Sequence, residues 1–336
     1  MMDLSIIIVN YKSSHHVMNC LHSIYESRMN IDYEIIIVDN ASKDNSQQEI
    51  CSLYKEITWI QSDYNAGFAR ANNMGIKASQ GRNILLLNAD TIITKNAIEQ
   101  TIIKFEDDKQ YAACGVQLLN TDHSKQQSGA KFIVGGINNF LALPYLGSLI
   151  KRIGYTLGMK QHNVVDMNQD MQVDWIVGAF IMTRRSIIEK SGLLDEDFFM
   201  YAEEIEWCSR IRKYGPMLLY HEPKVIHIGG GTSSKFYKKE SNENFSNLFD
   251  KKGKQIILSQ LLRIRKQYGA AWYLIHLLVY LFEIILFGAC IIIEITISVN
   301  KRKLGYSEWK GYTKNIFGIS HFIPAIAINK HIFYKA

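Results

Sequence analysis

Three apolar stretches in the first ninety residues end in polar side chains that could bind a nucleotide or a metal ion. Asn10 follows the first, Asp39 and Asn40 follow the second, and Asn88 and Asp90 follow the last. A carboxylate at a strand end can reach the edge of a base. It can also hold Mg²⁺ or Mn²⁺ against a diphosphate. These positions therefore suggest a site for a nucleoside diphosphate.

Each position also has an ordinary structural interpretation. Residues 39–42 could form a turn that caps the next helix, and residues 88–90 could cap a strand. Residues 62–68 could begin a helix, or their small residues could let backbone amides approach a phosphate. Asn88 is a neutral amide and a weaker metal ligand than Asp90, so it fits water or ribose better. The chain has no GxGxxG after the first strand and no GxxxxGK[ST], which argues against dinucleotide dehydrogenases and P-loop enzymes.

A cluster of six carboxylates lies further along, between residues 195 and 206. Acids at a helix N-terminus complement the helix dipole, which is the structural interpretation. Aromatic residues interleave these acids, however, and a partly buried carboxylate has the raised pKa that a general base needs. Glu203 and Glu204 would point about 100° apart on a helix, so we expect different roles for them. His227, which precedes three glycines, is either a structural residue or a second metal ligand.

Alternating strand and helix patterns position these residues. Short apolar runs without polar alternation predict strands at 4–9, 34–38, 57–61 and 83–87, with helices at 14–26, 46–54 and 68–78. This order implies an α/β fold with a doubly wound, mostly parallel sheet, whose ligands bind beyond the carboxyl ends of the strands. Residues 120–172 are less regular. Strand character returns at 173–182, 217–220 and 225–228, with a helix at 184–191 and another near 95–106.

Seven segments, in order, make the chain similar to a known family. They are IIIVNY, IIIVDNASKDNS, DYNAGFARANNMGI, LLLNADT, VDWIVGAFIMTRR, GLLDEDFFMYAEEIEWCSRIRKYG and VIHIGGGTS. Over residues 4–230 the chain resembles bacterial glycosyltransferase family 2, inverting nucleotide-sugar enzymes of the A-type fold, and within it the rhamnosyltransferase-like branch. The resemblance implies a catalytic domain at 1–234, with a Rossmann-like nucleotide-sugar half at 1–95 and an acceptor half at 96–234.

The resemblance also implies roles for individual residues. The positions expected to contact the donor are Asn10, Asp39, Asn40, Asn65, Gly67, Asn72, Asn88, Asp90 and Trp175. Asp90 matches the last Asp of the family's Asp-x-Asp metal motif, in which Asn88 replaces the first, and His227 matches a histidine that completes the site for Mg²⁺ or Mn²⁺. Glu204 stands where the family has the Asp that serves as catalytic base, and Glu203 is the alternative base.

The last hundred residues differ in charge from the rest. Residues 1–234 contain 22 Lys and Arg against 26 Asp and Glu, a balance of −4, whereas residues 235–336 contain 16 against 6, a balance of +10. Within this extension, residues 271–298 are apolar and long enough to cross a bilayer, although Glu283 and Glu294 make insertion costly. Basic residues at 235–266 and 301–303 flank the segment. Spanning, lying in the interface, and packing on the catalytic domain all remain open. We favour attachment to an anionic membrane surface. Binding of the basic extension to nucleic acid is not expected, because the sequence contains no nucleic-acid-binding motif.

The remaining composition bounds the location. The five cysteines are scattered and odd in number, which indicates reduced thiols. The first residues lack the basic start of a signal peptide. With the basic and apolar extension, these features suggest a protein at the cytoplasmic face of the bacterial inner membrane. The resemblance to the rhamnosyltransferase-like branch implies transfer of L-rhamnose from dTDP-L-rhamnose, or next of a hexose from a UDP-hexose, to a polyprenyl-linked or polysaccharide acceptor in O-antigen or capsule synthesis. The alternative is a catalytically silent subunit that binds a membrane or a partner enzyme.

Overall fold

The computed structural model describes residues 2–157, 163–164, 167–229, 247–297 and 304–336. These residues form two compact units. The first comprises the described parts of 1–131, 162–196 and 203–238, and the second those of 132–161, 197–202 and 239–336. The domains predicted at 1–234 and 235–336 remain predictions. The units differ from them by grouping residues 132–161 and 197–202 with the C-terminal helices. Of the basic flanks, residues 235–246 and 301–303 lie outside the described residues.

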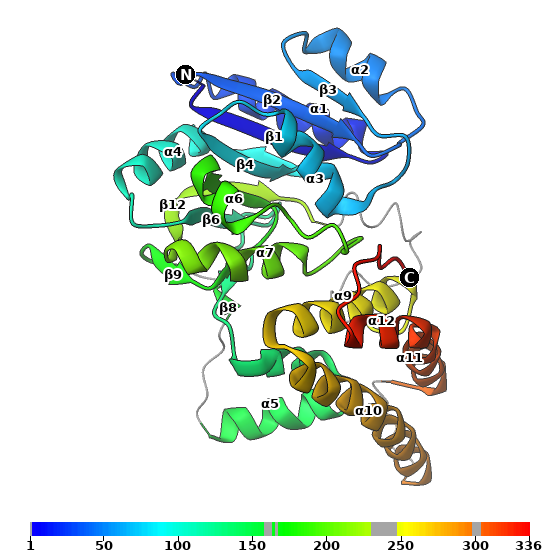
Figure 1. Cartoon of the computed structure of the whole chain (residues 1–336). Helices are drawn as coiled ribbons and strands as arrows, with labels where there is room; N and C mark the ends of the chain where they lie inside the picture. Colours follow the sequence, from blue (N-terminus) through cyan, green and yellow to red (C-terminus); the bar gives the residue numbers. More distant parts are fainter. Residues whose placement is uncertain (1, 158–162, 165–166, 230–246, 298–303) are drawn as a thin grey trace. The chain divides into compact units, whose positions relative to one another are not determined.

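The first unit is built on one large sheet with the strand order β3-β2-β1-β4-β11-β6-β12-β5, with β9 also paired to β12. Strands β1 to β4 are parallel to their neighbours in this set, as predicted for runs buried on both faces (Figure 1). The strands and helices of this half are β1 (Leu4–Asn10), α1 (Ser14–Glu26), β2 (Tyr33–Asp39), α2 (Ser46–Leu53), β3 (Thr58–Gln61), α3 (Gly67–Ala78) and β4 (Asn83–Asn88). The α/β class expected from the sequence is confirmed.

The other half of this sheet is mixed. Strand β11 is antiparallel to β4 and β6, while β12 is parallel to β6 and antiparallel to β5 and β9. A small second sheet has the order β10-β7-β8. The elements are β5 (Thr91–Ile93), α4 (Ala97–Asp107), β6 (Ala113–Leu119), β7 (Gly129–Ala130), β8 (Asn163–Val164), β9 (Met171–Val173), β10 (Trp175–Ile176), β11 (Phe180–Arg184), α6 (Arg185–Ser191), α7 (Glu203–Ile211), the 3₁₀ helix η2 (Arg212–Tyr214) and β12 (Met217–His227).

Two sequence-based predictions for this half were wrong. The run 173–182 is not one strand, because β9, β10 and β11 pair with different partners. The two short strands expected at 217–220 and 225–228 form the single strand β12, which continues past an irregularity between Tyr220 and Lys224. A local irregularity of this kind bends a strand without ending it.

Helices cover both faces of the large sheet. On one face, side chains of α1 and α4 pack against inward-facing residues of β1, β2 and β4, and Val17, Ile24 and Phe105 are fully buried there. On the other face, α3, α6 and α7 pack against the alternate residues of the same strands, where Trp207 is fully buried. Because successive side chains of a strand point to opposite faces, the non-alternating runs supply both cores.

The second unit is helical in its described residues. It contains the 3₁₀ helix η1 (Val134–Ala142), α5 (Leu146–Thr156), α9 (Lys251–Tyr268), α10 (Ala270–Thr296), α11 (Tyr306–Gly318), the 3₁₀ helix η3 (Ser320–Phe322) and α12 (Ile323–Ala327). One described helix, α10, is long and apolar enough to cross a membrane by length and composition. Within this unit α10 packs against α9 and α11, so part of its surface is covered by protein.

Candidate active site

The ends of β1 and β2 form a buried polar network around Asp39. Asn10 lies opposite Asp39 in the parallel pair, and its Nδ2 donates to Asp39 Oδ1 over 2.7 Å. The Oδ1 of Asn10 accepts from the backbone N–H of Ser13, and Ser42 donates from both its N–H and its hydroxyl to Asp39. Asn10 is fully buried. It therefore orients the Asp39 carboxylate.

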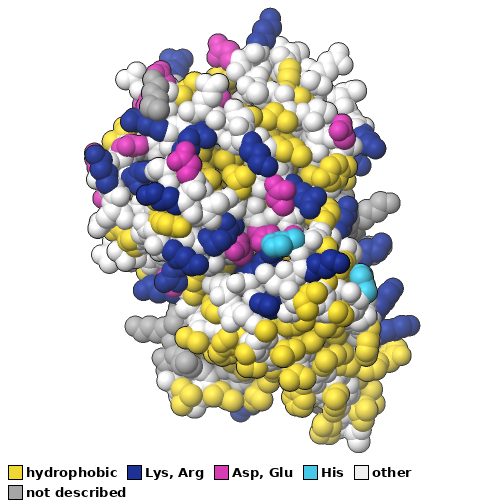
Figure 2. Space-filling model, in the orientation of Figure 1, with side chains coloured by type: hydrophobic (Ala, Val, Ile, Leu, Met, Phe, Trp, Pro, Cys, Tyr) yellow, Lys and Arg dark blue, Asp and Glu magenta, His cyan; other side chains and the backbone are white. Residues whose placement is uncertain are grey.

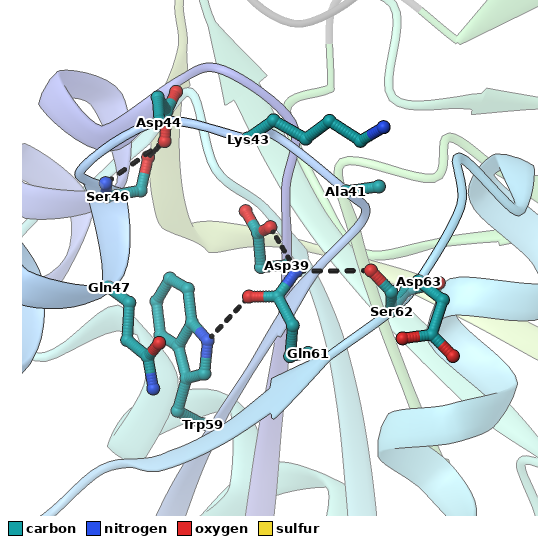
Figure 3. A pocket seen from close by; sticks show the side chains of 10 residues that line it. All are labelled: Asp39, Ala41, Lys43, Asp44, Ser46, Gln47, Trp59, Gln61, Ser62 and Asp63. Carbon is teal, nitrogen blue, oxygen red and sulfur yellow. Dashed lines mark hydrogen bonds between the residues drawn. The ribbon is translucent and has the colours of Figure 1, made fainter.

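A pocket of about 260 Å³ lies beside Asp39, at the carboxyl ends of β2 and β3 (Figure 3). Trp59 and Gln61 line it from the same face of β3, because they are two residues apart. The Gln61 amide donates to Asp39 Oδ2 over 2.8 Å, and its Oε1 accepts from the Trp59 indole N–H over 3.3 Å. An aromatic ring beside a fixed carboxylate and amide suits a planar, hydrogen-bonding group such as a nucleobase.

The neighbouring loop before α3 is held by Asn40. Its Nδ2 donates to Asn65 Oδ1 and to the Gly67 carbonyl, and its Oδ1 accepts from the Ala66 N–H. Gly67 has a φ of 79°, in the region that favours glycine, and its N–H donates to Asn65 Oδ1. The structure thus brings Asn40, Asn65 and Gly67 together. It does not bring Asn72 into this group, since that amide donates to the Phe68 carbonyl of its own helix.

A second cluster forms where β4, β5 and β12 meet. His227 ends β12 and pairs with Thr91 of β5, which places its ring next to the end of β4. His227 Nε2 lies 3.4 Å from Asp90 Oδ1 and 3.4 Å from Asn88 Nδ2. The side chains of Asp90 and His227 are 6% and 11% exposed. Asp90 and His227, the two predicted metal ligands, therefore lie together. Asn88, which is 139 positions from His227 in the chain, lies beside them.

Gln126 selects the tautomer of this histidine. Its Nε2 donates to Asn120 Oδ1 and to the His227 carbonyl, which leaves Oε1 as the acceptor that faces the ring. The distance from this Oε1 to His227 Nδ1 is 2.7 Å, so Nδ1 carries the proton. The lone pair is then on Nε2, the nitrogen that faces Asp90. A ring fixed in this way through its other nitrogen is typical of a metal-binding histidine.

The pair fits a divalent cation that also binds substrate. Two ligand atoms that each lie about 2.1 Å from one cation are separated by roughly 3 to 3.5 Å, as Asp90 Oδ1 and His227 Nε2 are. The described residues contain no group of three or more His, Cys, Asp or Glu that could hold a metal. With one or two protein ligands, Mg²⁺ or Mn²⁺ takes its remaining ligands from water and phosphate oxygens.

The carboxylates of Glu203 and Glu204 open α7 and differ in their surroundings. Glu203 is buried, and its Oε2 has no hydrogen-bond partner among the described residues. Burial, with a smaller effect from the charge of Glu204, raises the pKa of Glu203 well above its usual value. A raised pKa strengthens a base, but the neutral form, which burial favours here, cannot accept a proton. Glu204, which is only partly buried, is the better candidate for the base.

The turn between β10 and β11 connects this carboxylate to the metal cluster. A Cβ added at Gly178 would lie 3.6 to 3.9 Å from carbons of the Glu204 side chain, so that side chain covers the glycine. The next residue, Ala179, accepts a 3.0 Å hydrogen bond from the Asn88 N–H. Glu204 and Asn88 therefore flank one short turn. Trp175 lies three residues before the glycine, in β10, and is partly buried.

The pocket beside Asp39 and the pair formed by Asp90 and His227 thus lie at the carboxyl ends of strands, and the Glu204 carboxylate lies at the start of α7 in the same unit. A family model described as glycosyl transferase family 2 matches residues 5–192. The chain belongs to glycosyl transferase family 2. Its sheet, with the site at the strand ends, is the A-type fold of these enzymes. The match includes Asp39 and Asp90 and ends before Glu204 and His227.

Three relatives of this glycosyltransferase carry names for sugar transfer. A hexosyltransferase of low-salt glycan biosynthesis, Agl10 of Haloferax volcanii, is 34% identical over 217 residues, which cover 63% of this chain and 62% of that protein. Rhamnosyltransferase WbbL of Escherichia coli is 27% identical over a region that covers 76% of this chain and 94% of that protein. N-acetylglucosaminyl-diphospho-decaprenol L-rhamnosyltransferase of Mycobacterium tuberculosis is 22% identical, over 67% and 75%.

Sequence reasoning missed three residues that shape the site of this glycosyltransferase. Trp59 and Gln61 are separated by one residue in a predicted strand, so their shared face was a usable signal. Gln126 lies in the stretch 120–172, which has no regular pattern. Its link to His227 spans 101 positions, and no local signal could have revealed it.

Helix α7 is anchored at its far end from Glu204. The Trp207 indole N–H donates to the Gly192 carbonyl over 2.9 Å, and Arg210 binds both carboxylate oxygens of Glu206. Arg210 also donates to the Ser191 carbonyl, at the end of α6. Glu206 thus stabilises the helix through Arg210 and is not a candidate for the base, unlike Glu203 and Glu204.

Proposed function

We propose that this glycosyltransferase moves one sugar, with inversion at the anomeric carbon, from a nucleoside diphosphate to a hydroxyl group of its acceptor. The observation that supports this most directly is the short path from Asp90 and His227, through the turn at Gly178 and Ala179, to Glu204. If Glu204 is the proton acceptor and Asp90 and His227 lie at the leaving diphosphate, the two groups are on either side of this turn. An inverting transfer needs this separation because the acceptor attacks opposite the leaving group.

In this reaction Glu204 takes the proton from the acceptor hydroxyl as its oxygen bonds to the anomeric carbon. The bond from that carbon to the phosphate oxygen breaks, and the nucleoside diphosphate departs with the electron pair. Asp39, with Trp59 and Gln61, would hold the base, and Asn65 and Gly67 would hold the ribose and diphosphate. These contacts position the donor so that attack occurs from one side.

Asp90 and His227 would hold Mg²⁺ or Mn²⁺. When bound there, such a cation stabilises the negative charge that develops on the leaving diphosphate. Gln126 keeps the free lone pair of His227 directed toward Asp90. Asn88 lies beside both and could bind a water or the ribose.

The relatives suggest the donor. Two of them are named rhamnosyltransferases, and one of these names a diphospho-decaprenol acceptor. We therefore propose dTDP-L-rhamnose as the first donor to test and UDP-hexoses as the next, with a polyprenyl-linked saccharide as acceptor in the synthesis of a surface glycan such as O-antigen or capsule.

A panel of nucleotide sugars, assayed for release of the nucleoside diphosphate with Mg²⁺ or Mn²⁺ present, tests this proposal. Turnover is expected with dTDP-L-rhamnose and should increase when a polyprenyl-diphospho-sugar is added. Turnover with a UDP-hexose alone would correct the donor. An absence of turnover with every donor, despite nucleotide binding, would favour the silent binding subunit.

We also propose that the second unit attaches the protein to a membrane, at the cytoplasmic side. Glu283, near the middle of α10, is fully buried, and its two oxygens accept the N–H groups of Tyr145 and Leu146 at the start of α5. A carboxylate at a helix N-terminus satisfies unpaired N–H groups and the positive end of the dipole. The Tyr145 hydroxyl donates to Glu294. Both glutamates, predicted to make insertion costly, therefore contact protein groups.

The other faces of α10 and α5 are apolar and exposed. Figure 2 shows hydrophobic side chains gathered over α10, where Leu278 and Ile285 are 65% and 70% exposed. In α5, Leu149 and Ile153 are exposed at a spacing of four, next to Lys151 and the adjacent arginine. An exposed apolar surface bordered by basic residues fits an anionic bilayer. Because α9 and α11 cover one side of α10, we propose that the helix lies in the interface.

Replacing Leu278 and Ile285 together by Asp should release the protein from phosphatidylglycerol vesicles in a flotation assay. Each buried aliphatic side chain contributes about 1.5–3 kcal/mol, and tenfold in affinity corresponds to about 1.4 kcal/mol, so the loss should exceed tenfold. The control is Leu53→Asp, an exposed leucine of α2 in the first unit. Equal flotation of the double variant would contradict the proposed surface. Resistance of the wild type to carbonate extraction would instead indicate a spanning helix.

A further inference from the structure

Residues 197–202, which lead into the two candidate catalytic carboxylates, belong to the second unit, although the carboxylates belong to the first. The peptide bond from Ala202 to Glu203 joins them. These six residues are therefore joined directly to the first residue of α7. Residues 197–202 make their contacts with the C-terminal helices and with the last residues of the chain.

Asp197 carries the strongest of these contacts. Its Oδ2 lies 2.7 Å from Lys266 Nζ of α9, and the two side chains are 8% and 7% exposed. His331 Nδ1 lies 3.0 Å from the same oxygen. The backbone carbonyl of Asp197 accepts the Tyr334 N–H over 2.8 Å. Asp197 is thus bound through side chain and backbone, by α9 and by the C-terminal segment 331–336.

The following residues are bound in the same way. Phe198 forms a parallel bridge with Tyr334, and both are fully buried. Phe199 is fully buried with its ring against that of Phe333. The Met200 carbonyl accepts a 2.7 Å hydrogen bond from the hydroxyl of Ser259, a buried residue of α9. Successive residues from 197 to 200 therefore each have a partner from this unit.

The last two residues of the segment have an unfavourable backbone conformation. Tyr201 has a φ of 73° and Ala202 a φ of 67°, in the left-handed region that residues with a Cβ rarely adopt. Such conformations persist where surrounding contacts hold them, and they are concentrated at functional sites. Here they immediately precede Glu203, the first residue of α7.

We propose that Lys266 and the C-terminal segment 331–336 are positioning residues for Glu204, acting through residues 197–202. This proposal rests on the proposed function, in which Glu204 is the base. Lys266 fixes Asp197, the C-terminal segment pairs with Asp197 and Phe198, and Ser259 fixes Met200. Together they hold the left-handed pair that sets the start of α7. The helical unit then serves catalysis as well as attachment.

The test is Lys266→Met in the full chain, with steady-state kinetics on the donor found by the panel and a calorimetric Kd for the nucleoside diphosphate. We expect kcat to fall by roughly ten- to a hundredfold, the size of effect that misplacement by about 1 Å produces, with the nucleotide Kd unchanged. Lys266→Arg should recover most of kcat, because it retains the charge at Asp197. Arg265→Met is the matched control. It removes the neighbouring cation on α9, whose guanidinium donates instead to the Ala327 carbonyl.

A double variant separates positioning from general destabilisation. If Lys266 acts through Glu204, Lys266→Met should have no further effect on the residual rate of Glu204→Gln, since residues that act as a unit are not additive. Ser259→Ala gives a milder second probe, expected to lower kcat in the same direction. If wild-type transfer is present and Lys266→Met keeps its kcat, or if Arg265→Met loses as much, the positioning role is wrong. A wild type inactive with every donor overturns the proposed function instead.

Discussion

Glu204→Gln should lower the rate of sugar transfer by about 10²–10⁴ and leave the affinity for the nucleoside diphosphate nearly unchanged. General-base catalysis contributes a factor of this size, and the amide cannot accept the acceptor's proton. Gln has the same shape as Glu, so the side chain can still cover Gly178. The measurement is the transfer rate at saturating donor and acceptor, together with the nucleotide Kd.

Two further variants decide which carboxylate is the base. Glu203→Gln should retain far more activity, because burial already favours the neutral form of Glu203 and raises its pKa. Glu189→Gln, on the exposed side of α6, controls for the loss of a negative charge. A near-wild-type rate in Glu204→Gln, with Glu203→Gln inactive, would assign the base to Glu203.

The parallel half of the fold could be predicted from the sequence because local burial dictates it. The strand at residues 4–9 has apolar side chains on both faces, and the structure covers each face with helices. Polar residues such as Asp39 and Asp90 then lie along the same edge of the sheet, because the strands that precede them are parallel and end there. The mixed half could not be predicted in the same way. The run 173–182 divides into three strands, and the partners of these strands are remote in sequence.

The same limit applies to polar residues with remote partners. Glu283 was interpreted from sequence as an obstacle to membrane insertion, whereas in the structure it binds the start of α5, 138 positions away. The sequence of residues 132–157 gave no sign that they pack with the C-terminal helices. Sequence patterns report which face of an element is buried. They do not report which distant backbone groups a buried carboxylate will satisfy.

Asp90→Asn should lower transfer by about 10²–10³, the cost of losing a group that stabilises charge in the transition state. The mechanism also predicts a change in metal dependence. With a carboxylate and one imidazole as protein ligands, the cation needs oxygens of the donor to complete its coordination. Calorimetry should therefore detect weak Mn²⁺ binding to the wild type alone and much tighter binding when the nucleoside diphosphate is present. In Asp90→Asn this gain should be lost.

Two comparisons make this result specific. Asp122→Asn, in an exposed loop of the same unit, should leave both activity and Mn²⁺ binding unchanged. Gln126→Leu keeps Asp90 and His227 but removes the acceptor that holds the proton on Nδ1, so that Nε2 no longer has a fixed lone pair. Its Mn²⁺ affinity should fall by about 10- to 100-fold, as for other groups that orient a metal-binding histidine. Mn²⁺ binding as tight without nucleotide as with it would mean that the protein supplies more ligands than Asp90 and His227. Coupled binding, by contrast, would make the donor itself part of the metal site.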